Sequence, residues 1–102
     1  MITVTAEFRI NEGKETEALA AIEKLVAGVS ENEPGALTYS WHRDVKDPLQ
    51  LLVYEVYADQ EETKVHTASA HFAEFQKAFA RGLFDPGSVK ISRFERFAAI
   101  DR

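Results

Sequence analysis

The sequence predicts a single α+β domain whose elements follow the order strand, helix, strand, strand, helix, strand. Segments with apolar residues at every second position alternate with segments in which apolar residues recur every three or four positions. Proline, glycine and asparagine stand where one pattern changes to the other. At 102 residues the chain has the length of one domain with one hydrophobic core, so residues 1–102 are expected to fold together.

Residues 2–10 alternate apolar and polar side chains, a pattern typical of a strand with one buried face. A turn at residues 11–13 leads into an amphipathic helix. The apolar positions of this helix are Ala18, Leu19, Ile22, Leu25, Val26 and Val29. The helix must end by Pro34-Gly35, because proline cannot continue the helical hydrogen-bond ladder and glycine readily adopts the left-handed terminal conformation.

Two strands are expected next. The first begins at Ala36 and places Leu37, Tyr39 and Trp41 on one face, and residues 44–48 form the turn that follows. The second covers residues 49–57 and differs from the others because both of its faces carry apolar side chains. Both faces of this strand therefore need cover.

A helical region in two parts follows these strands. Asp59 has the character of an N-cap for a short helix that runs to about His66. Ser69 can cap a second helix, which ends near Gly82. The apolar stripe of this second helix consists of Phe72, Phe75 and Phe79.

After a turn at residues 85–87, a last strand is expected from roughly Ser88 to Ala99. Its apolar residues change parity between Ile91 and Phe94, which predicts a bulge there. The complete order β-α-β-β-α-β is the ferredoxin-like pattern, a four-stranded antiparallel sheet with two helical regions on one face. Because the second apolar face of strand 49–57 then lacks a partner, we expect a homodimer packed sheet to sheet.

Composition excludes several classes of function. The chain has 12 Lys and Arg residues against 17 Asp and Glu residues, a net charge of −5, so neither nucleic acid nor an anionic membrane is expected as a partner. It has no cysteine and therefore no disulfide, thiolate nucleophile or zinc-cysteine site. No signal sequence is evident and no window approaches the ~18 apolar residues of a membrane span, so a cytoplasmic location is expected.

His66 is the leading candidate for chemistry, because it follows the most apolar strand and imidazole exchanges protons near neutral pH. Glu55 is a carboxylate in an otherwise apolar strand, where burial would require a partner or raise its pKa. His71 lies about 140° around a continuous helix from His66, so the two share a face only if the helix breaks near Ser69. The alternatives to a catalytic role are that the two histidines are packed in the core or lie on the surface, and that Glu55 is a structural residue.

Other kinds of site have weaker support. The histidines and Glu55 lack the spacing of a specific metal site, and no metal is expected. No glycine-rich turn for flavin or nicotinamide, serine elbow or P-loop is present. Aromatic residues could line a pocket for a flat ligand or simply fill the core. They are Tyr39, Trp41, Tyr54, Tyr57 and Phe72.

Motifs along residues 3–97 resemble the antibiotic biosynthesis monooxygenase (ABM) family. These motifs are Gly13-Lys14-Glu15, Glu33-Pro34-Gly35, Tyr39, Asp47-Pro48, Glu55-x-Tyr57-x-Asp59 and His66-x-x-Ser69-x-His71-Phe72. The resemblance implies a dimeric α+β barrel with a cleft between sheet and helices in each subunit. It also implies relatives that oxidise anthrones or hydroquinones with dioxygen and without flavin or metal, and others that act in quorum-signal breakdown.

On this resemblance His66 is the proton acceptor or orienting group and Glu55 supports the site. Residues expected to contact a small aromatic substrate are Trp41, Tyr39, Tyr57, Phe72 and His71. The chain departs from the family pattern at Thr63, where members of the family commonly have a small residue. The helix around Thr63 is also more polar than the resemblance leads us to expect. Haem degradation is not expected, because that branch places a tryptophan near the position of His66 and an axial histidine near that of Gln76.

The sequence therefore predicts a cofactor-independent monooxygenase that acts on a quinol-like or polyphenolic small molecule, with dioxygen as co-substrate. Three alternatives remain open at this point. They are an isomerase that moves protons with His66 and Glu55, a ligand-binding dimer without catalysis, and a structural interaction module.

Overall fold

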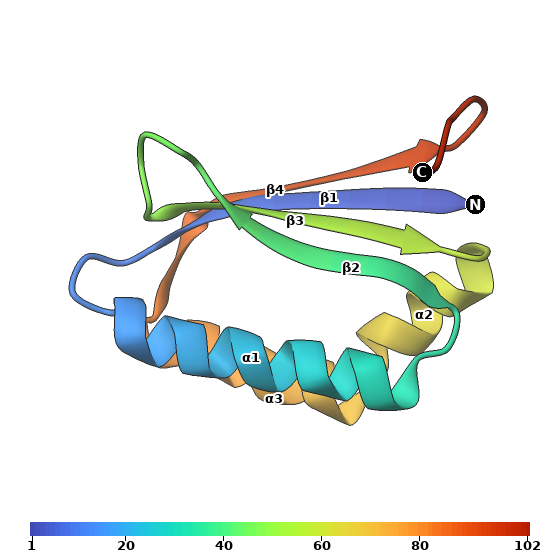
Figure 1. The fold of residues 1–102 in the computed structure, drawn as a ribbon. Helices are drawn as coiled ribbons and strands as arrows, with labels where there is room; N and C mark the ends of the chain where they lie inside the picture. Colours follow the sequence, from blue (N-terminus) through green and yellow to red (C-terminus); the bar gives the residue numbers. More distant parts are fainter.

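The structure, a computed structural model, describes all of residues 1–102. It contains four strands and three helices (Figure 1). In chain order these are β1 (Ile2–Ile10), α1 (Glu15–Asn32), β2 (Ala36–Arg43), β3 (Gln50–Tyr57), α2 (Gln60–Thr67), α3 (Ala70–Ala80) and β4 (Phe84–Glu95). The predicted ferredoxin-like α+β fold is therefore confirmed.

The four strands form one antiparallel sheet in the order β2-β3-β1-β4. Helices α1 and α3 run side by side beneath one face of the sheet, while its other face carries no helix (Figure 1). None of the three helices combines the length and apolarity needed to span a bilayer.

The hydrophobic core fills the space between the sheet and the helices. The residues on the inward face of β1 pack against the apolar stripe of α1. The alternation of apolar residues in β1 and their spacing of three to four positions in α1 predict this contact. The Phe8 ring packs with its centroid 5.5 Å from that of Trp41, 5.4 Å from that of Phe79 and 5.3 Å from that of Phe84. Such pairs stabilise the fold beyond the burial of their area.

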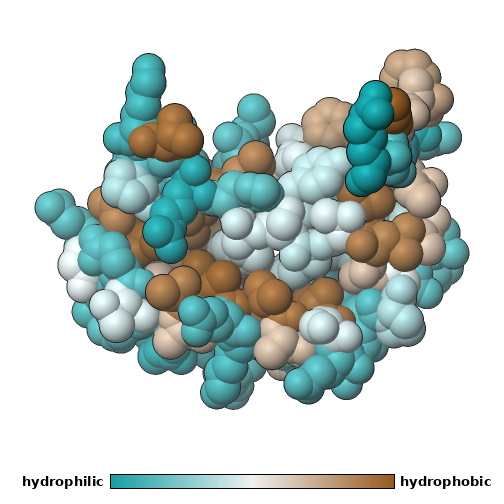
Figure 2. Space-filling model, in the orientation of Figure 1, coloured by the Kyte–Doolittle hydropathy of each residue, from teal (hydrophilic) through white to brown (hydrophobic).

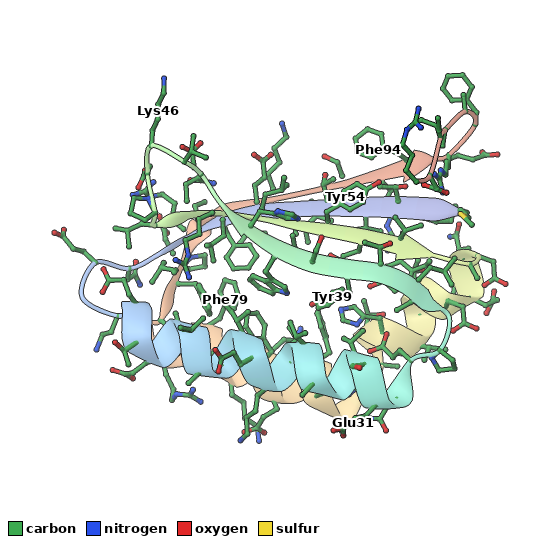
Figure 3. All side chains as sticks on the ribbon, viewed as in Figure 1. Glu31, Tyr39, Lys46, Tyr54, Phe79 and Phe94 are labelled. Carbon is green, nitrogen blue, oxygen red and sulfur yellow. The ribbon has the colours of Figure 1, made fainter.

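The two faces of the sheet differ in what they carry. Tyr39 and Phe79 point into the space between sheet and helices, whereas Tyr54 and Phe94 lie on the opposite side (Figure 3). Tyr54 is 39% exposed and Phe94 54% exposed, and Leu52 beside them is 36% exposed. The face without helices thus presents large apolar side chains to solvent.

The helical region breaks where the sequence predicts. The Asp59 carboxylate accepts a hydrogen bond from the Glu62 amide at 3.1 Å and caps α2. The Ser69 hydroxyl oxygen accepts one from the Phe72 amide at 3.1 Å and caps α3, and it donates to the His66 carbonyl at 2.7 Å. The break sets His66 at the end of one helix and His71 at the start of the next.

The predicted bounds of the last strand are wrong. β4 begins at Phe84 and ends at Glu95, and its pairing with β1 is continuous through Ile91 and Phe94, where a bulge was expected. The irregularity lies earlier, opposite residues 7–9. Pro86 has no amide hydrogen for the ladder there, and the Ser88 hydroxyl accepts the Arg9 amide hydrogen bond at 2.9 Å instead.

Leu37 also departs from its predicted place. The pairing of β2 with β3 shifts between Ala36 and Thr38, so Leu37 is the extra residue of a bulge and is 50% exposed. Beyond this bulge, Tyr39 and Trp41 face the core as expected.

Candidate active site

A cavity of about 430 Å³ lies between the sheet and the helices. Its size falls within the range of small-molecule sites, and most of its wall is apolar. Apolar residues gather where the sheet meets α1, with charged residues around them (Figure 2). Six residues predicted from the sequence line this cavity, namely Tyr39, Trp41, Glu55, Tyr57, His66 and Phe72.

The His66 ring is almost fully enclosed, with 4% of the residue exposed. Three aromatic rings surround it, with centroids 5.2 Å (Tyr39), 5.8 Å (Tyr57) and 5.0 Å (Phe72) from its own. These rings come from β2, β3 and α3, so the orientation of the imidazole depends on three separate elements. Packing against these three rings therefore restricts the orientation of the imidazole, in addition to the hydrogen bonds that it makes.

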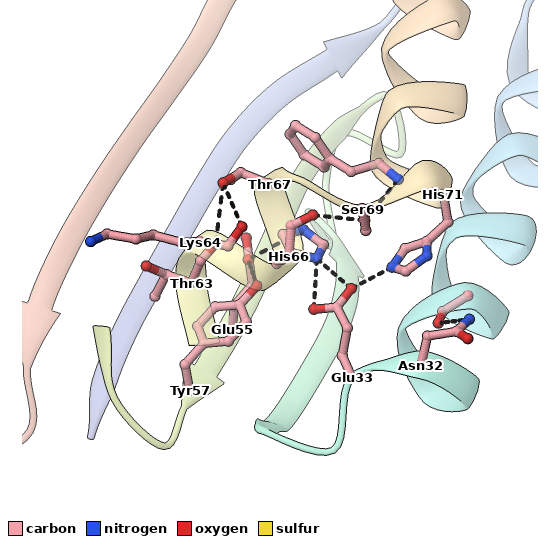
Figure 4. Close-up of polar contacts among 12 residues, drawn as sticks. Asn32, Glu33, Glu55, Tyr57, Thr63, Lys64, His66, Thr67, Ser69 and His71 are labelled. Atoms are coloured by element: carbon pink, nitrogen blue, oxygen red, sulfur yellow. Dashed lines mark hydrogen bonds and ion pairs between the residues drawn. The ribbon is translucent and has the colours of Figure 1, made fainter. Parts of the chain in front are cut away.

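Glu33 provides the hydrogen bond that orients the His66 ring (Figure 4). Nδ1 of His66 lies 3.1 Å and 3.0 Å from the two carboxylate oxygens of Glu33, whose side chain is 1% exposed. A carboxylate only accepts hydrogen bonds, so Nδ1 carries the hydrogen and Nε2 of the neutral ring keeps its lone pair. Nε2 points to the other side, where it lies 4.0 Å from Oε1 of Glu55.

His71 donates from Nε2 to the same Glu33 carboxylate. It does not line the cavity, contrary to its predicted contact with substrate. Because the chain breaks at Ser69, the His71 ring faces α1, where it lines a separate groove with Lys24, Glu74 and Arg81. A Cβ built on Gly28 of α1 would lie 2.5 Å from the His71 side chain, so only glycine leaves room for this ring.

Glu33 was not among the site residues predicted from the sequence, although it stands in the motif Glu33-Pro34-Gly35. It follows the last turn of α1 and precedes Pro34, a position that reads as the end of a helix. It stands four positions after Val29 and so continues the buried stripe of α1, a signal for its burial, but its partners lie 33 and 38 positions away. Glu33 Oε2, His66 Nδ1 and His71 Nε2 lie within 4.8 Å of one another, a spacing that one metal ion can bridge.

Glu55 and Tyr57 form a second polar pair in the wall. The Tyr57 hydroxyl donates to Oε1 of Glu55 at 2.5 Å. Burial raises the pKa of the Glu55 carboxyl, although the Tyr57 hydrogen bond and His66 oppose that change. Burial also raises the pKa of the Tyr57 phenol, and the neighbouring Glu55 raises it further. The cavity thus favours the neutral forms of both groups.

The indole nitrogen of Trp41 is buried and has no hydrogen-bond partner within the chain. An unpaired buried donor costs free energy unless water or a ligand accepts its hydrogen. Trp41 lies in the cavity wall, which makes it a candidate donor to an oxygen atom of a bound molecule.

Replacing Gly28 by alanine should destabilise the protein by about 1–3 kcal/mol, because the new methyl group overlaps the His71 ring. Alanine in a helix interior normally stabilises by up to about 1 kcal/mol, so a loss would identify the close contact as its cause. Urea unfolding measures the effect. Ser30→Ala on the exposed side of α1 is the matched control, and a gain in stability for Gly28→Ala would contradict the contact.

Glu55→Gln should make the protein more stable than wild type at neutral pH. The raised pKa of Glu55 means that its protonated form stabilises the folded state at low pH, and that this contribution is lost as pH rises through the folded-state pKa. Glutamine keeps an oxygen for the Tyr57 hydroxyl and carries no charge. Thermal unfolding between mildly acidic and neutral pH should show the difference shrinking as pH falls, whereas a difference that grows would contradict the assignment.

Comparisons with known proteins agree with this fold. The family model for antibiotic biosynthesis monooxygenase matches residues 1–78. A provisionally named antibiotic biosynthesis monooxygenase from Caulobacter crescentus is 26% identical, with a TM-score of 0.85 over 95% of this chain and 90% of that one. Rv0793 from Mycobacterium tuberculosis has a TM-score of 0.83 over 98% of each chain at 16% identity, and shares the fold.

A relative known from its sequence is the uncharacterized protein sll1783 of Synechocystis sp.. It is 26% identical over 90 residues, which make up 88% of this chain. The chain spans 60% of the length of that relative. With more than half of its residues matched by the family model, the chain belongs to the antibiotic biosynthesis monooxygenase family.

Proposed function

We propose that this protein is a cofactor-independent monooxygenase that acts on a quinol-like or polyphenolic small molecule. The observation that carries the proposal is an oriented imidazole in the wall of a largely apolar cavity of about 430 Å³. Membership in the family supports the same class of reaction.

His66 acts as the proton acceptor in this proposal. Glu33 holds the hydrogen on Nδ1, which leaves the lone pair of Nε2 free on the side of Glu55. A substrate hydroxyl beside Nε2 loses its proton to this nitrogen and becomes an electron-rich phenolate. The phenolate reduces dioxygen, so one oxygen atom joins the substrate and the other leaves as water, with all electrons supplied by the substrate.

The walls of the cavity suit a flat ring with oxygen substituents. Aromatic side chains offer faces for stacking, and the indole N–H of Trp41 offers a hydrogen bond to an oxygen. Glu55 lies opposite Nε2, where its raised pKa allows a protonated carboxyl to donate a hydrogen bond to a substrate oxygen.

His66→Ala should keep the fold and lower turnover about 10²–10⁴-fold, the usual contribution of a general base. The assay follows oxygen consumption with naphthohydroquinones and anthrones as probes, after subtraction of their spontaneous oxidation. His42→Ala, which removes a histidine that does not line the cavity, is the matched control, and its mass is compared with that of wild type because His42 lies on the sheet face without helices. Added imidazole should restore part of the lost rate.

Two results would refute the proposal. Equal turnover of a quinol in the absence of oxygen would exclude an oxygenase, and an unchanged rate in His66→Ala would exclude the proton acceptor. A drop in thermal stability with no kinetic defect in the folded fraction would assign His66 a structural part only.

An isomerase is the second candidate, favoured by one specific observation. His66 and Glu55 face each other at 4.0 Å across the cavity wall, so one can remove a proton while the other returns it elsewhere on the substrate. This reaction needs no dioxygen. Turnover of a small oxygenated metabolite at the same rate with and without air would support the isomerase over the oxygenase.

We further propose that the protein is a homodimer packed through the sheet face without helices. Leu52, Tyr54 and Phe94 are exposed there, and a sheet with apolar residues on both faces needs cover on both.

Tyr54→Glu should convert the dimer to a monomer, because it sets a carboxylate in the middle of the apolar surface. Light scattering at micromolar concentration measures the mass. Val65→Glu, a similar change at an exposed residue of α2, should leave the dimer intact. A wild-type protein of monomeric mass would contradict the proposal.

A further inference from the structure

We propose that Glu33, His66 and His71 form a binding site for one divalent transition-metal ion of the zinc class. Their donor atoms are His66 Nδ1, His71 Nε2 and the Glu33 carboxylate, all within 4.8 Å of one another. The three residues come from the end of α2, the start of α3 and the turn after α1, so the fold brings them together from distant parts of the sequence.

The donor set has the chemistry that such ions prefer. Two imidazoles and one carboxylate bind zinc in proteins, with a solvent molecule or substrate in the remaining position. Neutral imidazole also suits cobalt, nickel and iron, whereas magnesium prefers a set made of oxygen atoms. The site should therefore discriminate against magnesium.

The distances allow an ion to enter with small side-chain movements. Zinc ligands lie about 2.0–2.2 Å from the ion, so neighbouring donor atoms are roughly 3–3.5 Å apart. Nδ1 of His66 is 3.0 Å from Oε2 of Glu33 and 3.1 Å from Oε1. The closer contact between His71 and Glu33 must open and the two imidazole nitrogens, now within 4.8 Å of each other, must reach this spacing; His71 is the most exposed of the three.

A metal-bound imidazole usually donates the hydrogen of its other ring nitrogen to an acceptor. Nε2 of His66 lies 4.0 Å from Oε1 of Glu55, beyond hydrogen-bond distance, so a small approach of the two groups would complete this contact. The His71 ring is held against Gly28. Glu55 is fixed in turn by the Tyr57 hydroxyl.

A groove beside His71 brings solvent to one of the three ligands. Its lining includes the carboxylate of Glu74 together with Lys24 and Arg81, and the His71 side chain is 13% exposed. Of the three ligands only His71 lines this groove, so an ion that approaches from this side meets His71 first.

A metal ion bound in this site would prevent His66 from accepting a proton. This consequence rests on the proposed function. A metal on Nδ1 displaces the hydrogen from that nitrogen, and a neutral imidazole then carries it on Nε2. The lone pair that faces the cavity is lost. The metal-free chain is thus the active form, and bound zinc is an inhibitor.

The test uses tag-free protein freed of metal with a chelator that is then removed. Zinc titration by calorimetry should show one ion bound per chain in wild type and in His42→Gln, which removes an exposed histidine elsewhere. His71→Gln keeps a side-chain amide near Glu33 but no imidazole, and should bind zinc at least about 10–100-fold more weakly. Magnesium should not bind to any of the three proteins.

A second readout needs no variant. On addition of zinc to wild type, the imidazole signals of His66 and His71 in the nuclear magnetic resonance spectrum should shift together, while those of His42 stay in place. Equal zinc affinity in wild type and His71→Gln, loss of binding in His42→Gln, or a shift confined to His42 would each overturn the site.

Turnover measurements test separately whether bound zinc inhibits the reaction. Stoichiometric zinc that shifts the His66 and His71 signals and abolishes turnover of a naphthohydroquinone supports both proposals. Zinc that binds in the same way and leaves turnover unchanged supports the metal site and contradicts His66 as the proton acceptor.

Discussion

The buried carboxylate of Glu33 ties together the ends of all three helices, because it follows α1 and accepts hydrogen bonds from histidines on α2 and α3. A carboxylate this deeply buried is tolerated only when its oxygens are satisfied. Two imidazoles satisfy them, and in return the rings lose their freedom to rotate. The same contact therefore stabilises the junction of the helices and sets which nitrogen of His66 faces the cavity.

The rest of the architecture serves this junction. The break at Ser69 turns α3 away from α2, so that one histidine borders the cavity and the other meets Gly28 of α1. The sheet supplies Glu55 and Tyr57 from one strand and Tyr39 and Trp41 from its neighbour. An uninterrupted helix would point the two histidines in different directions, and Glu33 could then bind only one of them.

Much of the fold could be predicted because it follows from local pattern. Alternation placed β1, apolar residues on both faces placed β3, helical spacing placed α1, and cap residues placed the break before α3. The errors lie where the hydrogen-bonded pairing of strands departs from the alternation of apolar residues in the sequence. These places are the bulge at Leu37 and the irregular start of β4 near Pro86. The position of His66 beside a cavity followed from the same elements. The part played by Glu33 did not, because helical spacing from Val29 indicates its burial but not the two histidines, 33 and 38 positions away, that donate to it.

Glu33 fixes the hydrogen of His66 on Nδ1 and leaves Nε2 as an acceptor facing the cavity. Long-range ¹H–¹⁵N correlation spectra of metal-free protein at mildly alkaline pH observe this arrangement directly. The account predicts a protonated Nδ1 and an unprotonated Nε2 for His66, with the opposite pattern, hydrogen on Nε2, for His71. A hydrogen found on Nε2 of His66, or an average of the two forms, would contradict it.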